Sequence, residues 1–375
     1  MSGKNLRHGY TTGACAAAAA KGAALLLRDR VPADSVEITL PAGMTAGFRL
    51  HSCELRGDAA ICSVIKDAGD DPDVTNGAEI KAEVSFTPGA GGTIDIEGGE
   101  GIGRVTKPGL AVAVGGWAIN PVPRRMIEEA IREVFPDSRF PVPGFCRISI
   151  PNGAELARKT LNSRLGIVGG LSILGTTGIV RPISAKAWTD TIDTAIDVAL
   201  ACGCRTVVLS TGRTSEMTAQ KHFWLGTGGG ESGIRDQGPG TSKDLTEEAF
   251  VMMGDHVGYA LRACARKGVA RVVLAGQFAK LLKIACGHEQ THVTSSELDL
   301  QMLEQWLDQA GLRSLVPGPW SLVNTARQVL EMSGNQPALM ELVCSRAAAF
   351  ARQVAPTLPV TVLLAGYGGE VLYCA

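Results

Sequence analysis

The second half of the chain alternates helical and strand patterns, and this alternation restricts the fold more than any other feature of the sequence. Helical patterns cover residues 186–203, 247–268 and 339–355, and short strands rich in Val or Leu follow at 206–212, 271–277 and 360–366. Such alternation is typical of βαβ units and a parallel sheet. We therefore predict an α/β domain over residues 186–375 with a mainly parallel sheet.

The carboxyl ends of these strands are the expected places for a ligand, because open α/β sheets bind ligands there. In this chain they are residues 210–213, 276–280 and 366–369. A glycine-rich segment at 226–243 carries scattered charges and predicts a mobile surface loop.

The first half of the chain has the pattern of several strands with few helices. Stretches with β-branched residues predict strands at 35–41, 47–55, 59–66, 78–86 and 146–151. Helices are expected over the alanine-rich residues 14–27 and over 124–135, which follow Pro123. The pattern favours an α+β domain over residues 1–185, and a length of 375 residues suits two domains.

Composition excludes several classes of protein. A net charge of −1 argues against general binding to nucleic acid or membrane surfaces, and only 5% of the residues are aromatic. The ten cysteines include no C-x-x-C pair, so we expect reduced thiols. The apolar stretch near the start is interrupted by Lys21 and lacks an export cleavage site. We expect a cytoplasmic protein without nucleic-acid or membrane partners.

Cations are segregated locally, although the chain as a whole is almost neutral. Residues 101–127 contain Arg104, Lys107, Arg124 and Arg125 but no acid, and residues 156–189 contain five cations, including Arg164, again without an acid. These side chains could lie on solvated faces. They could instead surround a ligand with several carboxylates or phosphates, to which Arg makes bidentate contacts and glycine turns offer backbone amides.

Two short stretches each allow two interpretations. Thr11, Thr12 and Gly13 precede the alanine-rich helix, so they form either a plain helix cap or a turn that binds an anion at the helix start. The acidic stretch 67–73 contains four aspartates and is either an Asx-rich turn or a site for a cationic or hydroxyl-rich ligand.

Common catalytic motifs are missing or weak. "HEQTH" at 288–292 matches the zinc-protease pattern H-E-x-x-H, but glycine before it and Thr and Val after it disfavour the required helix. The stretch "GGEGIGR" lacks the spacing of the dinucleotide fingerprint and its strand–helix context, and the sequence has no P-loop or G-x-S-x-G elbow. The residues alone indicate a two-domain enzyme with an anion-rich ligand.

Several of these stretches together resemble the cobalt-precorrin-5B (C1)-methyltransferase family, CbiD, of corrinoid synthesis. The stretches are "GYTTGACAAAAAKGA", "KDAGDDPDVTNGAEI", "GGEGIGRVTKPGLAVAVGGWAINPVPRRMI", "IPNGAELARKTLNSRLGIVGGLSILGTTGIVRPIS" and "STGRTSE", in this order. The chain departs from the family pattern at Gln277 and Ala279 and around "QTHVTSSELD", and residues 226–243 resemble an insertion.

The resemblance implies methyl transfer from S-adenosylmethionine to carbon 1 of cobalt-precorrin-5B, which gives cobalt-precorrin-6A. It implies no metal site, since cobalt enters only with the tetrapyrrole substrate, and it makes neighbouring corrinoid-pathway enzymes expected partners. The macrocycle has a rim of carboxylates that suits the cations, and the sulfonium and ribose of the donor suit carboxylates. On this basis we predict three groups of site residues: Asp67, Asp70 and Asp71 for catalysis; Thr11, Thr12, Gly13, Arg104, Lys107, Arg124, Arg125 and Arg164 for substrate; and Asp73, Gly99, Gly101, Gly103, Thr211 and Gly212 for the donor.

Two other classes of function stay open from the sequence. One is an enzyme without methyltransferase activity that acts on a polyanionic substrate. The other is a carrier or scaffold protein that binds a corrinoid without chemistry.

Overall fold

The computed structural model describes residues 6–87, 92–136, 142–182, 184–224 and 245–375. The predicted loop at 226–243 lies outside these described residues. The chain divides into two compact units, Met1–Ser184 (unit 1) and Ala185–Ala375 (unit 2).

Unit 1 is built on a five-stranded sheet with the order β4-β5-β6-β9-β7. All neighbours pair antiparallel except β7 and β9, which are parallel. In β6 every second residue is buried, the pattern of a strand with one face on the core. The strands are β4 (Ser52–Arg56), β5 (Ala59–Ile65), β6 (Glu79–Ser85), β7 (Asp95–Gly98) and β9 (Phe145–Ser149).

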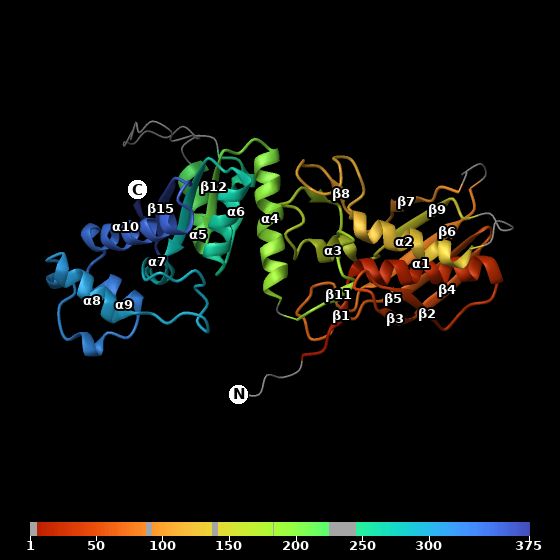
Figure 1. The fold of residues 1–375 in the computed structure, drawn as a ribbon, viewed down its shortest axis with the longest axis horizontal. Coiled ribbons are helices and arrows are strands. Elements are labelled where there is room, and N and C mark those ends of the chain that lie inside the picture. The colour runs from red at the N-terminus through yellow and green to blue at the C-terminus, as the bar shows by residue number, and fades with distance from the viewer. Residues whose placement is uncertain (1–5, 88–91, 137–141, 183, 225–244) are drawn as a thin grey trace. The chain divides into compact units, whose positions relative to one another are not determined.

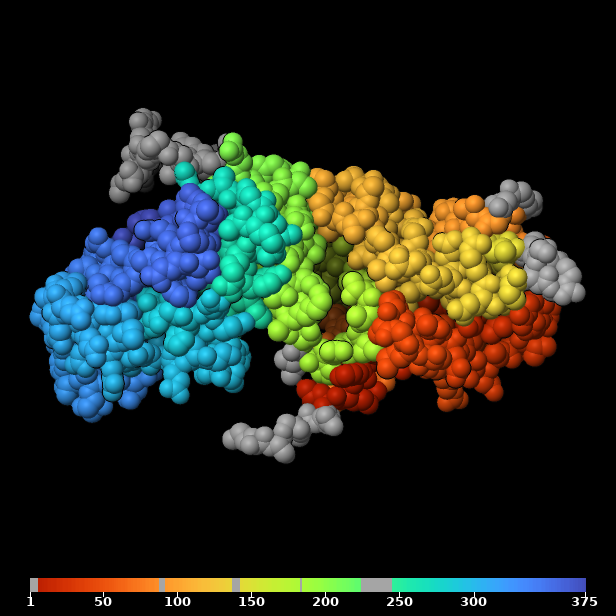
Figure 2. Space-filling view, viewed as in Figure 1, coloured from red at the N-terminus to blue at the C-terminus, as the bar shows by residue number. Residues whose placement is uncertain are grey.

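Two helices form the helical layer of unit 1. α1 (Thr12–Asp29) and α2 (Pro121–Val134) pack against each other, and α1 also packs on β5 and β6 (Figure 1). The space-filling view shows α1 and α2 in direct contact (Figure 2). Small alanine side chains let α1 approach the sheet and α2 closely, and its residues Ala14 to Ala20 are all buried.

The predicted strand at 47–55 is two strands. β3 (Thr45–Arg49) pairs with β2 (Ser35–Thr39), whereas β4 pairs with β5. The chain changes sheets at Leu50 and His51, and an apolar pattern alone does not reveal which partner a strand will have. The remaining short elements of unit 1 are β1 (Gly9–Tyr10) with β11 (Ile179–Val180), β8 (Arg104–Val105) with β10 (Ile167–Val168), and α3 (Gly153–Ala157).

Unit 2 contains the predicted, mostly parallel sheet, with the order β13-β12-β14-β15-β16. The first four strands are parallel and β16 is antiparallel to β15. The strands are β12 (Thr206–Ser210), β13 (Phe250–Met252), β14 (Arg271–Gln277), β15 (Val360–Ala365) and β16 (Val371–Cys374).

The helix predicted over 247–268 is wrong in its first half. Glu247–Ala249 form one 3-10 turn, Phe250–Met252 form β13, and α6 begins only at Val257 and ends at Lys267. Strand pairing with β12 overrides the helical preference of this short apolar run, and Gly254 has a φ of 57° where the chain turns toward α6.

Helices cover both faces of this sheet. α5 (Arg213–Trp224) packs on one face, where Ala219 joins Val208, Val273 and Leu363 in one core cluster. The other face carries α4 (Ala185–Ala201), α6, α7 (Phe278–Ala285) and α10 (Pro337–Val354). The outer helices are α8 (Leu300–Gln309) and α9 (Ala326–Met332), with 3-10 turns at Arg313–Leu315 and Trp320–Leu322. Within the described part of the chain, no helix has the length and apolar character to span a membrane.

Candidate functional site

The residues at the start of α1 make contacts with other parts of unit 1. Thr11 is the N-cap, and its side chain accepts a hydrogen bond from the Ala14 amide at 3.2 Å. The Thr12 hydroxyl accepts from the Leu174 amide at 3.0 Å, and both threonines are buried. A Cβ on Gly13 would lie 2.7 Å from Pro123. These contacts account for all three residues as structural groups, and their contact with a substrate stays a prediction.

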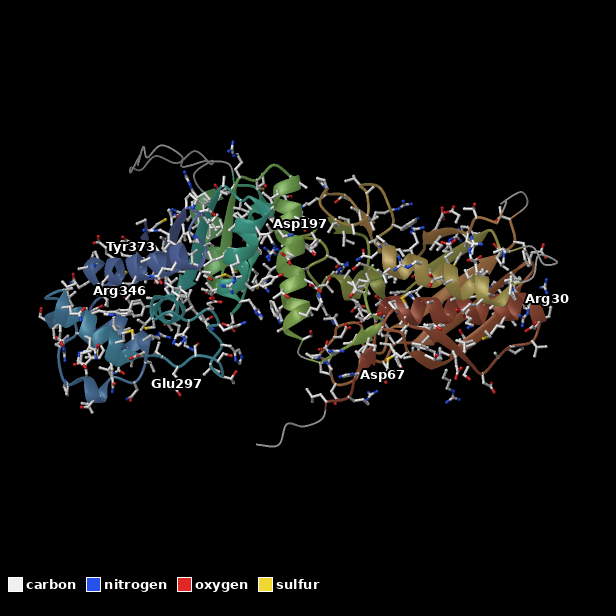
Figure 3. The ribbon with its side chains drawn as sticks, in the orientation of Figure 1. Arg30, Asp67, Asp197, Glu297, Arg346 and Tyr373 are labelled. Atoms are coloured by element: carbon white, nitrogen blue, oxygen red, sulfur yellow. The ribbon has the colours of Figure 1, made fainter. Side chains whose placement is uncertain are left out.

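The acidic loop after β5 has its own counter-ions. Arg7 forms an ion pair with Asp67, and the Arg7 amide donates to Asp70 at 2.7 Å. Lys66 donates to Asp73 at 2.7 Å, and only 1% of the Lys66 side chain is exposed. Figure 3 shows Asp67 at the end of unit 1 where α1 begins, opposite Arg30, which follows the last residue of α1.

These contacts set the protonation of the loop. The pKa of Asp67 is lowered, first by hydrogen bonds from the Arg7 side chain and then by one from the Gly69 amide. Burial raises the pKa of Asp73, but hydrogen bonds from Lys66 and Thr75 outweigh it, so the net pKa is lowered. Both carboxylates are therefore charged at neutral pH.

Three glycines of unit 1 lie tightly against other parts of the chain. A Cβ on Gly101 would lie 1.9 Å from the Ile150 carbonyl oxygen, and Gly101 has a φ of 72°. A Cβ on Gly99 would lie 2.3 Å from the Ser149 hydroxyl, and one on Gly103 would lie 2.4 Å from Ile167. Packing inside the chain thus requires glycine at all three positions, whether or not a donor binds there.

The predicted substrate cations all lie in unit 1. The Arg104 guanidinium stacks over the Trp117 ring at 3.5 Å from its centroid and donates to the Gly115 carbonyl. Lys107 donates to the Arg164 carbonyl oxygen at 3.3 Å, and Arg124 donates to the Ile96 carbonyl oxygen at 3.0 Å. Arg125 lies 3.9 Å from Glu129. Pairing of β8 with β10 brings the chain segments that carry Arg104, Lys107 and Arg164 close together.

A cavity of about 560 Å³ lies beside β3 and β5 in unit 1. Its lining includes Tyr10, Gly47, Phe48 and Asp67. The Tyr10 and Phe48 rings have centroids 4.5 Å apart, so the cavity has an aromatic side and a carboxylate. The sequence did not indicate this cavity, because its lining residues come from segments that are separated in the chain.

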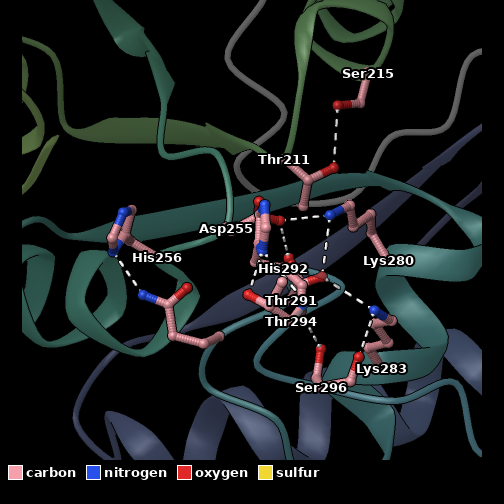
Figure 4. A network of polar contacts seen from close by, with 11 residues as sticks. Thr211, Ser215, Asp255, His256, Lys280, Lys283, Thr291, His292, Thr294 and Ser296 are labelled. Carbon is pink, nitrogen blue, oxygen red and sulfur yellow. Dashed lines mark hydrogen bonds and ion pairs between the residues drawn. The ribbon is translucent and has the colours of Figure 1, made fainter. Parts of the chain in front are cut away.

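The carboxyl edge of the sheet in unit 2 carries a polar network (Figure 4). Lys280 forms an ion pair with Asp255 and donates to the Thr291 carbonyl oxygen at 3.1 Å. The Thr291 hydroxyl donates to Asp255 at 2.6 Å. Lys283 donates to the Thr291 and Ser296 carbonyl oxygens at 3.2 and 2.8 Å.

The same edge contains both residues of unit 2 that the sequence predicts to bind the methyl donor. Thr211 and Gly212 directly follow β12, and the Thr211 hydroxyl lies 3.4 Å from the Ser215 hydroxyl on α5. Asp255 was missed because it follows β13, the strand hidden in the expected helix. Its signal was the apolar run "FVMM" directly before the turn residues "GD".

Residues 288–292 form no helix, so the H-E-x-x-H match lacks the geometry of a zinc protease. Glu289 pairs with Arg262, whereas Gln290 lies 2.6 Å from the His256 ring nitrogen. Among the described residues, no group of three or more potential metal ligands is assembled.

Comparison with known proteins gives matches along the whole chain. The family model CbiD matches residues 1–182, and the model CbiD, C-terminal domain, matches residues 290–375. A cobalt-precorrin-5B C(1)-methyltransferase of Geobacter metallireducens is 66% identical over 100% of both chains. The protein of the same name in Geobacter sulfurreducens is 64% identical over 100% of this chain and 99% of that one.

One solved structure also matches. It is titled cobalamin biosynthesis protein (cbiD) from Archaeoglobus fulgidus, is 27% identical, and covers 82% of this chain and 85% of that chain with a TM-score of 0.37.

Proposed function

This chain belongs to the CbiD family, and from that membership we propose that it is the methyltransferase that modifies carbon 1 of cobalt-precorrin-5B in cobalamin biosynthesis. The observation that carries this conclusion is the match to relatives of that name from one end of the chain to the other. A carrier or an unrelated enzyme would not be expected to share both halves so fully.

We infer that the methyl donor is S-adenosylmethionine. Carbon 1 supplies the electron pair of the new carbon–carbon bond, the sulfur–methyl bond breaks, and sulfur keeps its electron pair as a thioether. The positive charge then passes to the macrocycle, which can release a proton. Because this is an in-line displacement, alignment of the two reactants and electrostatics should supply most of the rate.

The predicted cations of unit 1 are the best candidates for the carboxylate rim of the macrocycle. The segments that carry Arg104, Lys107 and Arg164 meet at the β8–β10 pair. Stacking on Trp117 holds the Arg104 guanidinium in place, so less side-chain freedom is lost when a carboxylate binds. Arg124 and Arg125 on α2, together with Thr11, Thr12 and Gly13 at the start of α1, complete the proposed substrate residues.

The aspartates of the acidic loop keep a proposed role in chemistry. A carboxylate near carbon 1 could stabilise positive charge or accept the released proton. Asp70 is exposed and its carboxylate takes one backbone hydrogen bond, so it is less committed than Asp67 or Asp73. We expect Asp70→Asn and Asp71→Asn to slow single-turnover methylation more than they weaken pigment binding. Wild-type turnover in both variants would make the loop purely structural.

The decisive experiment is incubation of the full chain with cobalt-precorrin-5B and isotopically labelled S-adenosylmethionine, followed by mass spectrometry of the pigment. We expect the pigment to gain one labelled methyl group at carbon 1. Tight pigment binding without a mass gain would instead identify a carrier, and turnover of a nucleotide would indicate the other enzyme class.

The substrate residues can be tested by pigment affinity. We expect Arg104→Ala and Lys107→Ala each to weaken binding by about 1–3 kcal/mol, as the loss of a charge-assisted hydrogen bond does. Arg56→Ala is the matched control, because Arg56 is an exposed cation of the same unit paired with Glu54. Equal pigment affinities in the wild type and the three variants would show that the macrocycle does not bind at this surface.

A further inference from the structure

We propose that the methyl donor binds in unit 2, at the carboxyl edge of the sheet between the ends of β12 and β14. This inference rests on the proposed function for the identity of the donor. The location of the site is inferred from the structure of unit 2 alone.

The strand order marks this edge as a ligand position. From β12 the chain passes to β13 on one side, whereas the next strand, β14, lies on the other side of β12. The connections therefore leave the sheet in opposite directions at β12 and β14, which opens a crevice outside their carboxyl ends. Thr211 and Gly212 follow β12 there, and Gly276 and Gln277 end β14. A Cβ on Gly276 would lie 3.3 Å from the Thr211 hydroxyl, so the two strand ends are adjacent.

An aspartate that follows β13 has one carboxylate oxygen available for a ligand. Both side-chain bonds to the Asp255 carboxylate, from Lys280 and Thr291, end on Oδ1. In the part of the chain that the structure describes, Oδ2 has no hydrogen-bond partner. Burial raises the pKa of Asp255, but Lys280 and Thr291 lower it more, so the carboxylate is charged. A carboxylate after the second strand of a doubly wound sheet is the group that accepts from ribose hydroxyls.

The network also holds more positive than negative charge. Lys280 and Lys283 both donate to the Thr291 carbonyl, and Asp255 is the carboxylate that they face in this network. Burial and the nearby Lys280 charge lower the pKa of Lys283. A carboxylate on the ligand would balance this excess, and the amino-acid end of S-adenosylmethionine carries one.

Two further observations favour an occupant at this edge. Ser210, the last residue of β12, is fully buried, and its hydroxyl has no hydrogen-bond partner among the described residues. Buried hydroxyls are normally paired, so a missing partner needs an explanation. Two residues further on, a Cβ on Gly212 would meet no atom of the described residues within 4 Å. The end of β12 thus has both an unpaired buried hydroxyl and, two residues later, open space.

The other predicted donor residues offer less. The Asp73 carboxylate is already paired with Lys66, and the space around Gly99, Gly101 and Gly103 is filled by the chain itself. The cavity beside β3 is the remaining rival. It contains Gly47, where a Cβ would likewise meet no atom within 4 Å in the part of the chain that the structure describes.

These two glycines give a matched test. Neither has a left-handed φ, so Gly212→Leu and Gly47→Leu each add a side chain to open space in one of the two places. Binding of S-adenosylhomocysteine, the demethylated donor, is measured by calorimetry on the full chain without pigment. We expect Gly212→Leu to weaken binding at least tenfold and Gly47→Leu to leave it within twofold of wild type.

Thr211→Val is a second variant that removes a hydroxyl with almost no change in shape, and it should weaken binding severalfold. Circular dichroism confirms the fold of each variant, and if Gly212→Leu does not fold, Thr211→Val decides. The proposed site is wrong if folded Gly212→Leu and Thr211→Val bind S-adenosylhomocysteine as tightly as the wild type does. It is also wrong if the wild-type chain does not bind S-adenosylhomocysteine. A chain that binds the donor here but does not methylate cobalt-precorrin-5B refutes the proposed function and leaves the site intact.

Discussion

At the scale of single residues, the most unusual group is a lysine inside unit 1. Lys66 is among the largest fully buried side chains, and its ammonium group contacts the Asp73 carboxylate. A charge in such surroundings is tolerated only when it is paired, since removal from water costs several kcal/mol. Asp73, which the sequence predicts as a residue that binds the methyl donor, is therefore needed to neutralise the buried charge of Lys66.

Asp73→Asn should destabilise unit 1 strongly. It leaves the Lys66 charge buried without a carboxylate, and we expect a loss of up to about 3 kcal/mol, the lower end for a broken buried pair because Asp73 is partly exposed. Urea denaturation at neutral pH measures the loss. Asp70→Asn is the control and should cost far less, because Asp70 is exposed.

The same pair gives a pH dependence. The folded pKa of Asp73 is lowered, so its contribution to stability is present above the ordinary aspartate pKa of about 3.9 and is lost as the pH falls through the folded value. Wild type should thus lose stability in acid more steeply than Asp73→Asn. Parallel acid profiles for the two proteins would contradict this coupling.

At the scale of elements, the start of α1 is held by contacts within unit 1. Its N-cap hydroxyl, its second threonine and its glycine all contact other parts of unit 1. The helix ends at Asp29, and the next residue, Arg30, caps it with a φ of 59° and donates its amide to the Leu26 carbonyl.

Thr11→Ala should cost about 1 kcal/mol of stability, the usual effect of losing an N-cap. The melting temperature measures this loss, and Thr11→Ser, which keeps the hydroxyl, should restore most of it. If Thr11→Ala also weakens pigment binding in a folded protein, the turn contacts the substrate as well as capping the helix.

The β4–β5 pair contains an unexpected thiol contact. Cys53 and Cys62 are directly opposite each other, and their sulfur atoms lie 2.8 Å apart. Opposite residues of antiparallel strands have the Cα separation that a disulfide needs.

We expect diamide to oxidise this pair selectively. Each thiol gives up one proton and one electron as the S–S bond forms, and diamide takes up both protons and both electrons to become its hydrazine form. The chain therefore loses the mass of two hydrogens in intact-mass analysis. Cys53→Ser should abolish the change, whereas Cys264→Ser should not, because Cys264 is a buried cysteine of unit 2. Full alkylation of both thiols in the denatured protein after oxidation would contradict the expectation.

At the scale of the whole molecule, each unit has its own core. One large apolar cluster belongs to unit 1, and two clusters on opposite faces of the parallel sheet belong to unit 2. Because each core is closed within its own unit, folding of one should not require the other.

Fragments 1–184 and 185–375 should therefore fold when they are expressed separately. Each should show a cooperative thermal transition by circular dichroism and dispersed amide signals in NMR spectra. Aggregation of either fragment, or recovery of structure only on mixing, would mean that the units depend on each other for stability.

The sequence by itself determined the family, the mainly parallel sheet of unit 2 and most helices, because period, propensity and long motifs are local properties of a chain. It also placed Thr211 and Gly212 at the carboxyl end of a parallel strand, because residues that follow such a strand are recognisable from the strand. It did not reveal β13, since three residues become a strand only when β12 offers them hydrogen bonds. The partners of the acidic loop, Arg7 and Lys66, and the joining of Asp255, Lys280 and Thr291 were likewise decided by tertiary structure. Charge pairing and close glycine packing depend on distances between segments, and a linear pattern does not contain those distances.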